Sequence, residues 1–162
     1  MPTQQAVITR RPVERRDEPL LRELFASSRQ EWDLLPPSSR DTLLAMQFRA
    51  QRQQYAVSHP EASHQILVAD GVDIGQLILD ESPTAIRIVD VSIHQAYRGR
   101  GIASAVLGDV ISSAERVGLP VQLSVWSTNA GARRLYERLG FSVTAEANGY
   151  LNMHRPATQK GT

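Results

Sequence analysis

The stretch from Val91 to Ser104 constrains the fold most, because it leads from an apolar strand through a turn into an amphipathic helix. Gly99 and Gly101 let the backbone of the turn approach a ligand, and the start of the helix presents unpaired N–H groups and a positive dipole end. Arg98 and Arg100 add positive charge at the same place. The pattern therefore predicts a cradle for a phosphate or pyrophosphate group.

Glycine-rich turns of this kind occur in several ligand loops, and two of these do not match the residues. A dinucleotide-binding fingerprint needs a third glycine where Ser104 stands and an acidic residue at the end of the next strand, and residues 122–126 offer none. A Walker A loop needs Gly-Lys-Ser/Thr, but the only lysine in the chain is Lys160. An ordinary glycine-rich turn between a strand and a helix stays open as the alternative.

The composition indicates one globular domain, since the chain has 162 residues and is 41% apolar. Its net charge of +1 gives no support for a nucleic-acid or acidic-membrane partner. Without cysteine there is no disulfide, thiolate metal site or cysteine nucleophile, and the four histidines lack close ligand spacing, so we expect no metal. No secretion signal or run of 18 apolar residues occurs, which leads us to expect a soluble cytoplasmic protein.

The hydrophobic periodicity predicts strands and helices in a definite order. A strand over residues 6–13 is followed by a helix capped by Asp17 or Glu18, and a second helix begins at Ser38 or Ser39. Strands over 65–69, 74–80 and 85–93 come next, then a helix over 102–117, a strand over 121–126, a helix over 130–139 and a hairpin of 141–146 with 150–155. Because a helix joins them, strands 85–93 and 121–126 are expected to be parallel neighbours.

Two segments resemble the GCN5-related N-acetyltransferase (GNAT) superfamily. Arg98, Gly101 and Ala103 match its pyrophosphate-loop pattern Arg/Gln-x-x-Gly-x-Gly/Ala, and residues 127–141 are similar to its Asn-x-x-Ala-x-x-Leu-Tyr-x-x-x-Gly-Phe segment. The order of elements is similar to this family over nearly the whole chain. The resemblance implies an α/β fold with a central mixed sheet, splayed parallel fourth and fifth strands, about four flanking helices and a C-terminal β-hairpin. It also implies a single domain over residues 1–156, and residues 157–162 are expected to form a flexible tail.

The same resemblance implies acetyl-CoA as co-substrate. Its pantetheine would pair with the fourth strand as an added strand would, and the N–H of Val91 would polarise the thioester carbonyl. Asn129 would contact the pantetheine arm and Arg133 the 3′-phosphate, although a solvated helix face is an equal interpretation of Arg133. The implied cofactor-binding residues are Val91, Ser92, Ile93, Arg98, Gly99, Arg100, Gly101, Ile102, Ala103, Asn129 and Arg133.

Two side chains are candidates for the proton transfers. An acceptor amine with a pKa of about 10.4 is almost entirely protonated at neutral pH, so a base is needed. Asp90 is the carboxylate nearest in sequence to the expected reaction centre, and it would act as the base directly or through a water. The alternative is that Asp90 is a structural carboxylate. Tyr136 stands where the family's tyrosine protonates the leaving thiolate, and an aromatic ring that only packs is the alternative.

The resulting hypothesis is direct acetyl transfer to a primary amine, which can be a small molecule, a peptide N-terminus or a lysine. A non-catalytic acyl-CoA-binding module or sensor is the alternative function. Glu31, Trp32 and Asp33 lie between the first two helices, where they would contact the acceptor or pack onto the core. A homodimer is compatible with the sequence, which does not identify the acceptor.

Overall fold

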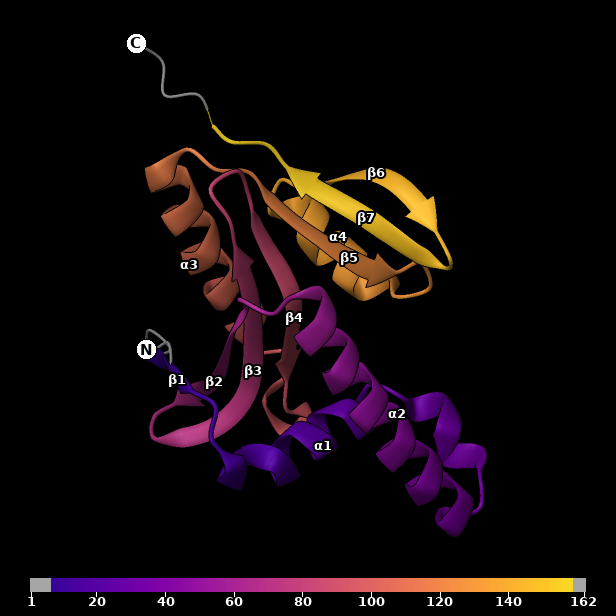
Figure 1. The fold of residues 1–162 in the computed structure, drawn as a ribbon. Helices are drawn as coiled ribbons and strands as arrows, with labels where there is room; N and C mark the ends of the chain where they lie inside the picture. Colours follow the sequence, from indigo (N-terminus) through magenta and orange to yellow (C-terminus); the bar gives the residue numbers. More distant parts are fainter. Residues whose placement is uncertain (1–6, 159–162) are drawn as a thin grey trace. The chain divides into compact units, whose positions relative to one another are not determined.

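The computed structural model describes residues 7–158, except for the side chains of Gln30 and Glu31. Ala6, in the expected first strand, and residues 159–162 of the expected tail lie outside this range. The elements, labelled in Figure 1, are β1 (Ile8–Pro12), η1 (Arg15–Asp17), α1 (Glu18–Ser27), η2 (Gln30–Leu34), α2 (Pro37–Ser58), β2 (Ser63–Ala69), β3 (Val72–Glu81), β4 (Ile86–Ile93), η3 (Gln95–Tyr97), α3 (Ile102–Val117), β5 (Val121–Trp126), α4 (Ala130–Arg138), β6 (Ser142–Ala147) and β7 (Tyr150–Arg155).

The seven described strands form one mixed sheet in the order β1-β2-β3-β4-β5-β7-β6. β4 and β5 are parallel, as the strand–helix–strand order predicts, and β5 pairs with β7 and β6 with β7 in antiparallel fashion. The turns between β2 and β3 and between β6 and β7 each have two consecutive residues with positive φ: Asp70 and Gly71, at 49° and 81°, and Asn148 and Gly149, at 55° and 82°. This is the backbone conformation that tight two-residue hairpins require.

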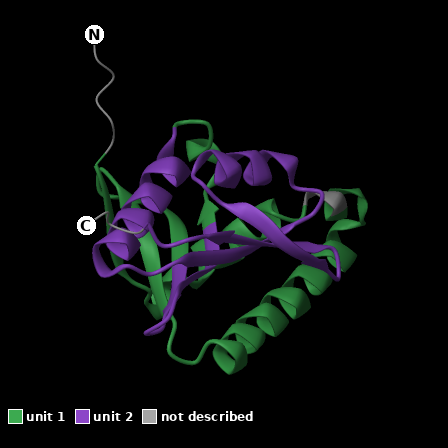
Figure 2. Cartoon of the chain, turned by 90° about the horizontal axis from the view of Figure 1, so that it is seen from above, with its two compact units in different colours: residues 1–77, 92–100 green, residues 78–91, 101–162 purple. Residues whose placement is uncertain are grey.

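The chain divides into two compact units, coloured separately in Figure 2. The first comprises residues 1–77 and 92–100, and the second comprises residues 78–91 and 101–162. In the first unit, Leu21 and Phe25 of α1 pack with Phe48 of α2 and Ile66 of β2, and the two phenylalanine rings meet edge to face at 5.8 Å. This core fixes α1, which contacts the candidate loop described below.

The second unit buries one face of α3 and one face of each central strand. Along β5 the side chains alternate between buried Leu123 and Val125 and exposed Ser124 and Trp126. The buried side chains of α3 recur at helical spacing, at Ile102, Val106, Leu107, Val110, Ile111 and Ala114. Gly118 ends this helix with a φ of 71°, as its position in the sequence predicts. In the described part of the chain, no helix is long and apolar enough to cross a membrane.

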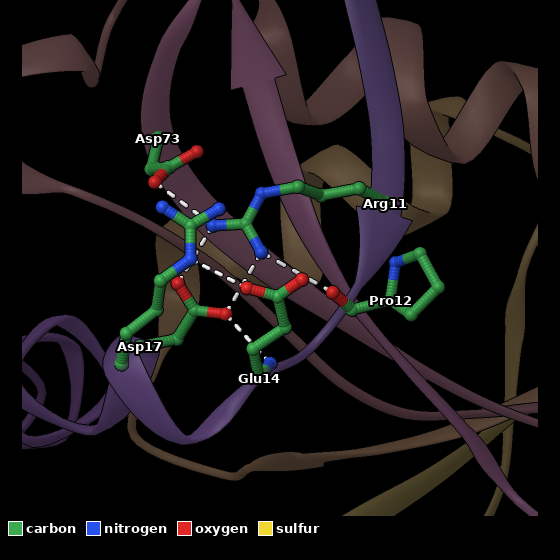
Figure 3. Close-up of polar contacts among 6 residues, drawn as sticks. Arg11, Pro12, Glu14, Asp17 and Asp73 are labelled. Atoms are coloured by element: carbon green, nitrogen blue, oxygen red, sulfur yellow. Dashed lines mark hydrogen bonds and ion pairs between the residues drawn. The ribbon is translucent and has the colours of Figure 1, made fainter.

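A buried ion pair replaces the expected side-chain cap at the start of α1. Asp17 makes no cap hydrogen bond to the helix and instead accepts two hydrogen bonds from Arg11, of 2.6 and 2.8 Å (Figure 3). Arg11 also donates to Asp73 at 2.9 Å, and the backbone N–H of Glu14 donates to Asp17 at 2.7 Å. Asp17 therefore does not cap α1. Together with Arg11 and Asp73 it links β1, the β2–β3 hairpin and the turn before α1.

Candidate functional site

The predicted ligand loop has the backbone conformation that its glycines suggest. Gly99 and Gly101 have φ angles of 77° and 76°, in the left-handed region that favours glycine. A Cβ atom at either position would meet no atom within 4 Å, so the space above the loop is open. Gly101 precedes α3 without a side-chain cap, so the N–H groups at Ile102 and Ala103 have no intrahelical partner. The loop thus offers the backbone donors that a phosphate needs.

The two arginines of the loop contact the protein itself. Arg98 donates from Nε to the carbonyl oxygen of Ile93 at 3.0 Å and from Nη2 to the hydroxyl of Ser27 at 3.1 Å. The guanidinium of Arg100 lies 5.1 Å from the centre of the Tyr97 ring, as a cation–π pair. Arg98 therefore holds the loop to the end of β4 and to α1, and Arg100 stays exposed.

A second bridge joins the loop to α1. Nε2 of His94 lies 2.7 Å from a carboxylate oxygen of Glu23, while Nδ1 of His94 accepts a hydrogen bond from the N–H of Ala96 at 3.1 Å. Since Nδ1 accepts, Nε2 carries the proton and donates to Glu23. Glu23 and Ser27 lie one turn apart on α1, as the i, i+4 positions of a helix do. We call the contacts Glu23–His94 and Ser27–Arg98 the α1 clamp.

Gly75 fixes the end of β4 from the neighbouring strand. A Cβ atom at Gly75 would lie 2.3 Å from the carbonyl oxygen of Ser92, so the two backbones come closer than a side chain permits. The N–H of His94 also donates to the carbonyl of Ile74 at 2.6 Å. Sequence reasoning did not select Gly75, although a glycine inside a strand pattern is a known signal of close backbone approach.

Within the second unit, β4 and β5 are paired over only part of their length. The described register joins Ile86 to Val121, Arg87 to Gln122 and Ile88 to Leu123, and it does not extend to Val89–Val91. The register between the two parallel strands therefore ends before the residues where the family resemblance places the thioester. A ligand can pair with a strand edge of this kind.

Asp90 and Tyr136, the two candidate catalytic residues, both belong to the second unit and interact electrostatically. The largely buried position of Tyr136 and, second, the negative charge of Asp90 raise its pKa to about 12. The Tyr136 ring packs edge to face on Phe141 at 5.9 Å, and its carbonyl accepts from the N–H of Phe141 at 3.0 Å. The Leu-Tyr and Gly-Phe parts of the predicted motif are thus joined by one helix end.

The other candidate residues on α4 have local partners. The side-chain oxygen of Asn129 accepts from the N–H of Ala132 at 3.1 Å and caps the helix. Arg133 donates to Glu137 at 2.7 Å, as an exposed i, i+4 ion pair. The amide NH₂ of Asn129 can still donate, whereas Arg133 would have to share or release Glu137 to reach a phosphate.

The segment between α1 and α2 is tied to the first unit. Trp32 packs on the core of α1 and α2, and Arg29 lies 5.8 Å from its ring centre. Asp33 accepts from Arg40 at 3.3 Å, and the side chain of Glu31 is outside the described residues. Trp32 therefore packs onto the core, which is one of the two expectations for this segment. Among the described residues, no group of three or more histidine or acidic side chains could hold a metal.

Comparison with protein families agrees with this arrangement. A family model described as "Acetyltransferase (GNAT) family" matches residues 21–141. A segment of 57 residues is 39% identical to an L-methionine sulfoximine/L-methionine sulfone acetyltransferase of Salmonella typhimurium, and one of 58 residues is 36% identical to YycN, an uncharacterised N-acetyltransferase of Bacillus subtilis. Each match spans 35% of this chain, and the matches span about a third of the relatives, 33% and 37%.

Solved structures share the fold over nearly the whole chain. The PaiA N-acetyltransferase of Thermoplasma acidophilum, in complex with coenzyme A, has a TM-score of 0.69 at 15% identity, over 93% of this chain and 99% of its own. An acetyltransferase of Thermus thermophilus has a TM-score of 0.68 at 19% identity, over 94% of this chain and 98% of its own. These likenesses confirm the fold predicted from the sequence.

Proposed function

This chain belongs to the acetyltransferase (GNAT) family, and we propose that it transfers the acetyl group of acetyl-CoA directly to a primary amine. Residues 1–156 would act as one catalytic domain. Because acetyl-CoA is an intracellular metabolite, we expect the enzyme to work in the cytoplasm. The observation that carries the proposal is the electrostatic interaction between Asp90 and Tyr136, a carboxylate and a phenol suited to opposite proton transfers.

Acetyl-CoA supplies an activated acetyl thioester, and the chain supplies donors that suit it. The open loop at Gly99 and Gly101 and the uncapped start of α3 suit its pyrophosphate. The edge of β4 beyond its register with β5, at Val89 and Val91, suits its amide-containing arm, and the N–H of Val91 would polarise the acetyl carbonyl. The remaining proposed contacts are the backbones of Ser92, Ile93, Arg98, Arg100, Ile102 and Ala103, with Asn129 on the arm and Arg133 on the 3′-phosphate.

Asp90 would remove the proton that keeps the acceptor amine unreactive. An amine that binds as ammonium has no free electron pair, so it attacks only after a base has taken a proton. The carboxylate of Asp90 can accept that proton directly or through a water. The nitrogen then bonds to the acetyl carbon, the carbon–sulfur bond breaks, and a second proton leaves the nitrogen to give the neutral amide.

Tyr136 would donate a proton to the departing sulfur. With a pKa of about 12 its hydroxyl stays protonated at neutral pH, but it is then a weaker acid than a thiol with an ordinary pKa of about 8.5. Protonation of Asp90 by the amine removes the negative charge that contributes to this high pKa. Taking the amine proton at Asp90 therefore makes Tyr136 a better acid at the moment when the thiolate forms. Tyr136 recovers its proton and Asp90 loses one to complete the cycle.

The direct test of the proposed function is release of free CoA thiol in the presence of a panel of amines. The panel should contain amino acids, including L-methionine sulfoximine because of the Salmonella relative, as well as peptides with free N-termini and lysine peptides. We expect thiol release that depends on one class of amine and matching acetylated product by mass spectrometry. A protein that binds acetyl-CoA tightly and acetylates no amine would be a sensor instead.

A further inference from the structure

An exposed pair of stacked aromatic rings lies at the carboxyl end of β5. The ring centres of Trp126 and Tyr150 are 4.0 Å apart with 24° between the planes, and the two residues face each other in the β5–β7 register. Their exposed fractions are 42% and 37%, although such large aromatic side chains are normally well buried. We call Trp126 and Tyr150 the aromatic platform.

The aromatic platform is held in place by the backbone beneath it. A Cβ atom at Gly149 would lie 3.2 Å from Cζ3 of Trp126, so the indole lies against the hairpin turn. The N–H of Ser127 donates to the carbonyl of Gly149 at 2.8 Å and ties this turn to the end of β5. On the same face, the hydroxyl of Ser124 donates to Asn152 at 2.7 Å. These contacts hold the two rings in place.

The platform differs from four of the other aromatic rings, which have an arginine over them. Arginine guanidinium groups lie within 6 Å of four ring centres, those of Phe25, Trp32, Phe48 and Tyr97. Among the residues that the structure describes, no arginine lies over Trp126 or Tyr150, although seventeen of the eighteen basic residues in the chain are arginine. The platform is thus accessible to a molecule from outside the chain.

The platform lies at the same end of the two parallel strands as the proposed site of acetyl transfer. The register of β4 with β5 ends at Ile88 and Leu123, and Val91 and Trp126 each lie three residues further along their strands. In the proposed function, the N–H of Val91 holds the acetyl carbonyl. The rest of an amine that attacks there would extend past the end of β5. This step rests on the proposed function.

We propose that the aromatic platform binds the body of the acceptor, and that the preferred acceptor is a primary amine carried on an aromatic or other flat apolar group. Such a body can stack on Trp126 in the offset or edge-to-face geometry that aromatic pairs adopt. A small hydroxylated amine offers no surface to the rings. Trp126 would therefore set the choice of acceptor, while Asp90 and Tyr136 act on its nitrogen and on the leaving sulfur.

The test compares two probe amines, 2-phenylethylamine and ethanolamine, by their kcat/KM values with acetyl-CoA. For the wild-type protein we expect a ratio of about 10 or more in favour of 2-phenylethylamine. Trp126→Leu keeps an apolar side chain but removes the flat ring, so it should lower that ratio by about 5- to 10-fold without changing the KM for acetyl-CoA. Val143→Ala is the matched control, because Val143 is an exposed apolar residue of the same hairpin outside the platform. It should leave the ratio unchanged.

Two results would overturn this inference while leaving the proposed function intact. One is a wild-type enzyme that prefers ethanolamine or a polyamine such as spermidine over 2-phenylethylamine. The other is a folded Trp126→Leu protein that loses activity equally on both probes, since that pattern indicates a structural ring. If the wild-type protein binds acetyl-CoA and acetylates no amine at all, the proposed function itself fails.

Discussion

The negative charge of Asp90 acts on the phenol of Tyr136, and with the burial of the ring it raises the pKa of Tyr136 to about 12. Asp90 lies on β4 beyond the last residue paired with β5, and Tyr136 lies on α4, the helix that follows β5. Interactions of this kind between a base and an acid couple their titrations. The first prediction concerns that coupling.

Asp90→Asn should lower the pKa of Tyr136, because a neutral amide no longer opposes formation of the phenolate. The change can be followed by NMR titration of ring-labelled tyrosine, with Tyr136→Phe to assign the resonance. In the activity assay, the same variant should lose most at neutral pH and recover as rising pH deprotonates the amine in solution. An equal loss of activity at every pH would show that Asp90 stabilises the structure of β4 and does not act as the base.

The α1 clamp should position the loop for acetyl-CoA. Glu23→Gln removes the charge that holds His94, and Ser27→Ala removes the hydroxyl that holds Arg98. Each variant should raise the dissociation constant for acetyl-CoA roughly fivefold, about the effect of one hydrogen bond, with kcat little changed.

Glu18→Gln is the matched control for the α1 clamp, because it breaks an exposed ion pair with Arg22 on the same helix without touching the loop. Isothermal titration calorimetry gives the three dissociation constants. A loop that binds acetyl-CoA equally well in all three variants would not depend on α1.

Gly101 should be required because its backbone adopts a positive φ and because it adds no negative charge to the phosphate cradle. Gly101→Ala should destabilise the protein by about 1–2 kcal/mol, because alanine is strained at a φ of 76°. Gly101→Glu should in addition weaken acetyl-CoA binding by about tenfold or more, since it brings a negative charge to the phosphate cradle. Gly108→Ala, in the middle of α3 with open space around it, should instead stabilise the fold. Thermal melts with and without acetyl-CoA separate these effects.

The Arg11–Asp17 pair predicts a loss of stability in acid. Hydrogen bonds from Arg11 lower the pKa of Asp17 from 3.8 to about 2 despite the burial of its carboxylate. Because the pKa of Asp17 is lower in the folded than in the unfolded protein, its ionised carboxylate stabilises the folded state at pH values above the unfolded pKa. This contribution, about 2 kcal/mol, should be lost as the pH falls from 4 to 2. Urea unfolding of Asp17→Asn should lack that step. Asp73→Asn, which removes a more exposed partner of the same arginine, should keep it.

Much of the fold could be predicted because each element carries its own local signal. Strand β5 and helix α3 have the predicted bounds, since Gly118 and Pro120 separate a helical period from a strand. Asn148 and Gly149 form the predicted turn because these residue types tolerate positive φ.

The site was less predictable where it depends on contacts distant in sequence. No local pattern joins Glu23 to His94 or Ser27 to Arg98, because these partners are 71 residues apart. The sequence suited Asp17 to a helix cap, but the charged guanidinium of Arg11 competes better for its carboxylate than backbone N–H groups do. The stacking of Trp126 on Tyr150 required the strand register, which hydrophobic periodicity alone does not give.

The most direct test of the account is the rate of acetyl transfer by Tyr136→Phe, measured together with its affinity for acetyl-CoA. Because only the hydroxyl is removed and the ring can still pack on Phe141, we expect kcat to fall by about 100-fold or more with the dissociation constant unchanged. Tyr97→Phe removes a hydroxyl from another half-buried tyrosine and should keep kcat within about twofold of the wild type. A Tyr136→Phe enzyme with wild-type kcat and a lowered melting temperature would contradict the proposed role of Tyr136 as the acid.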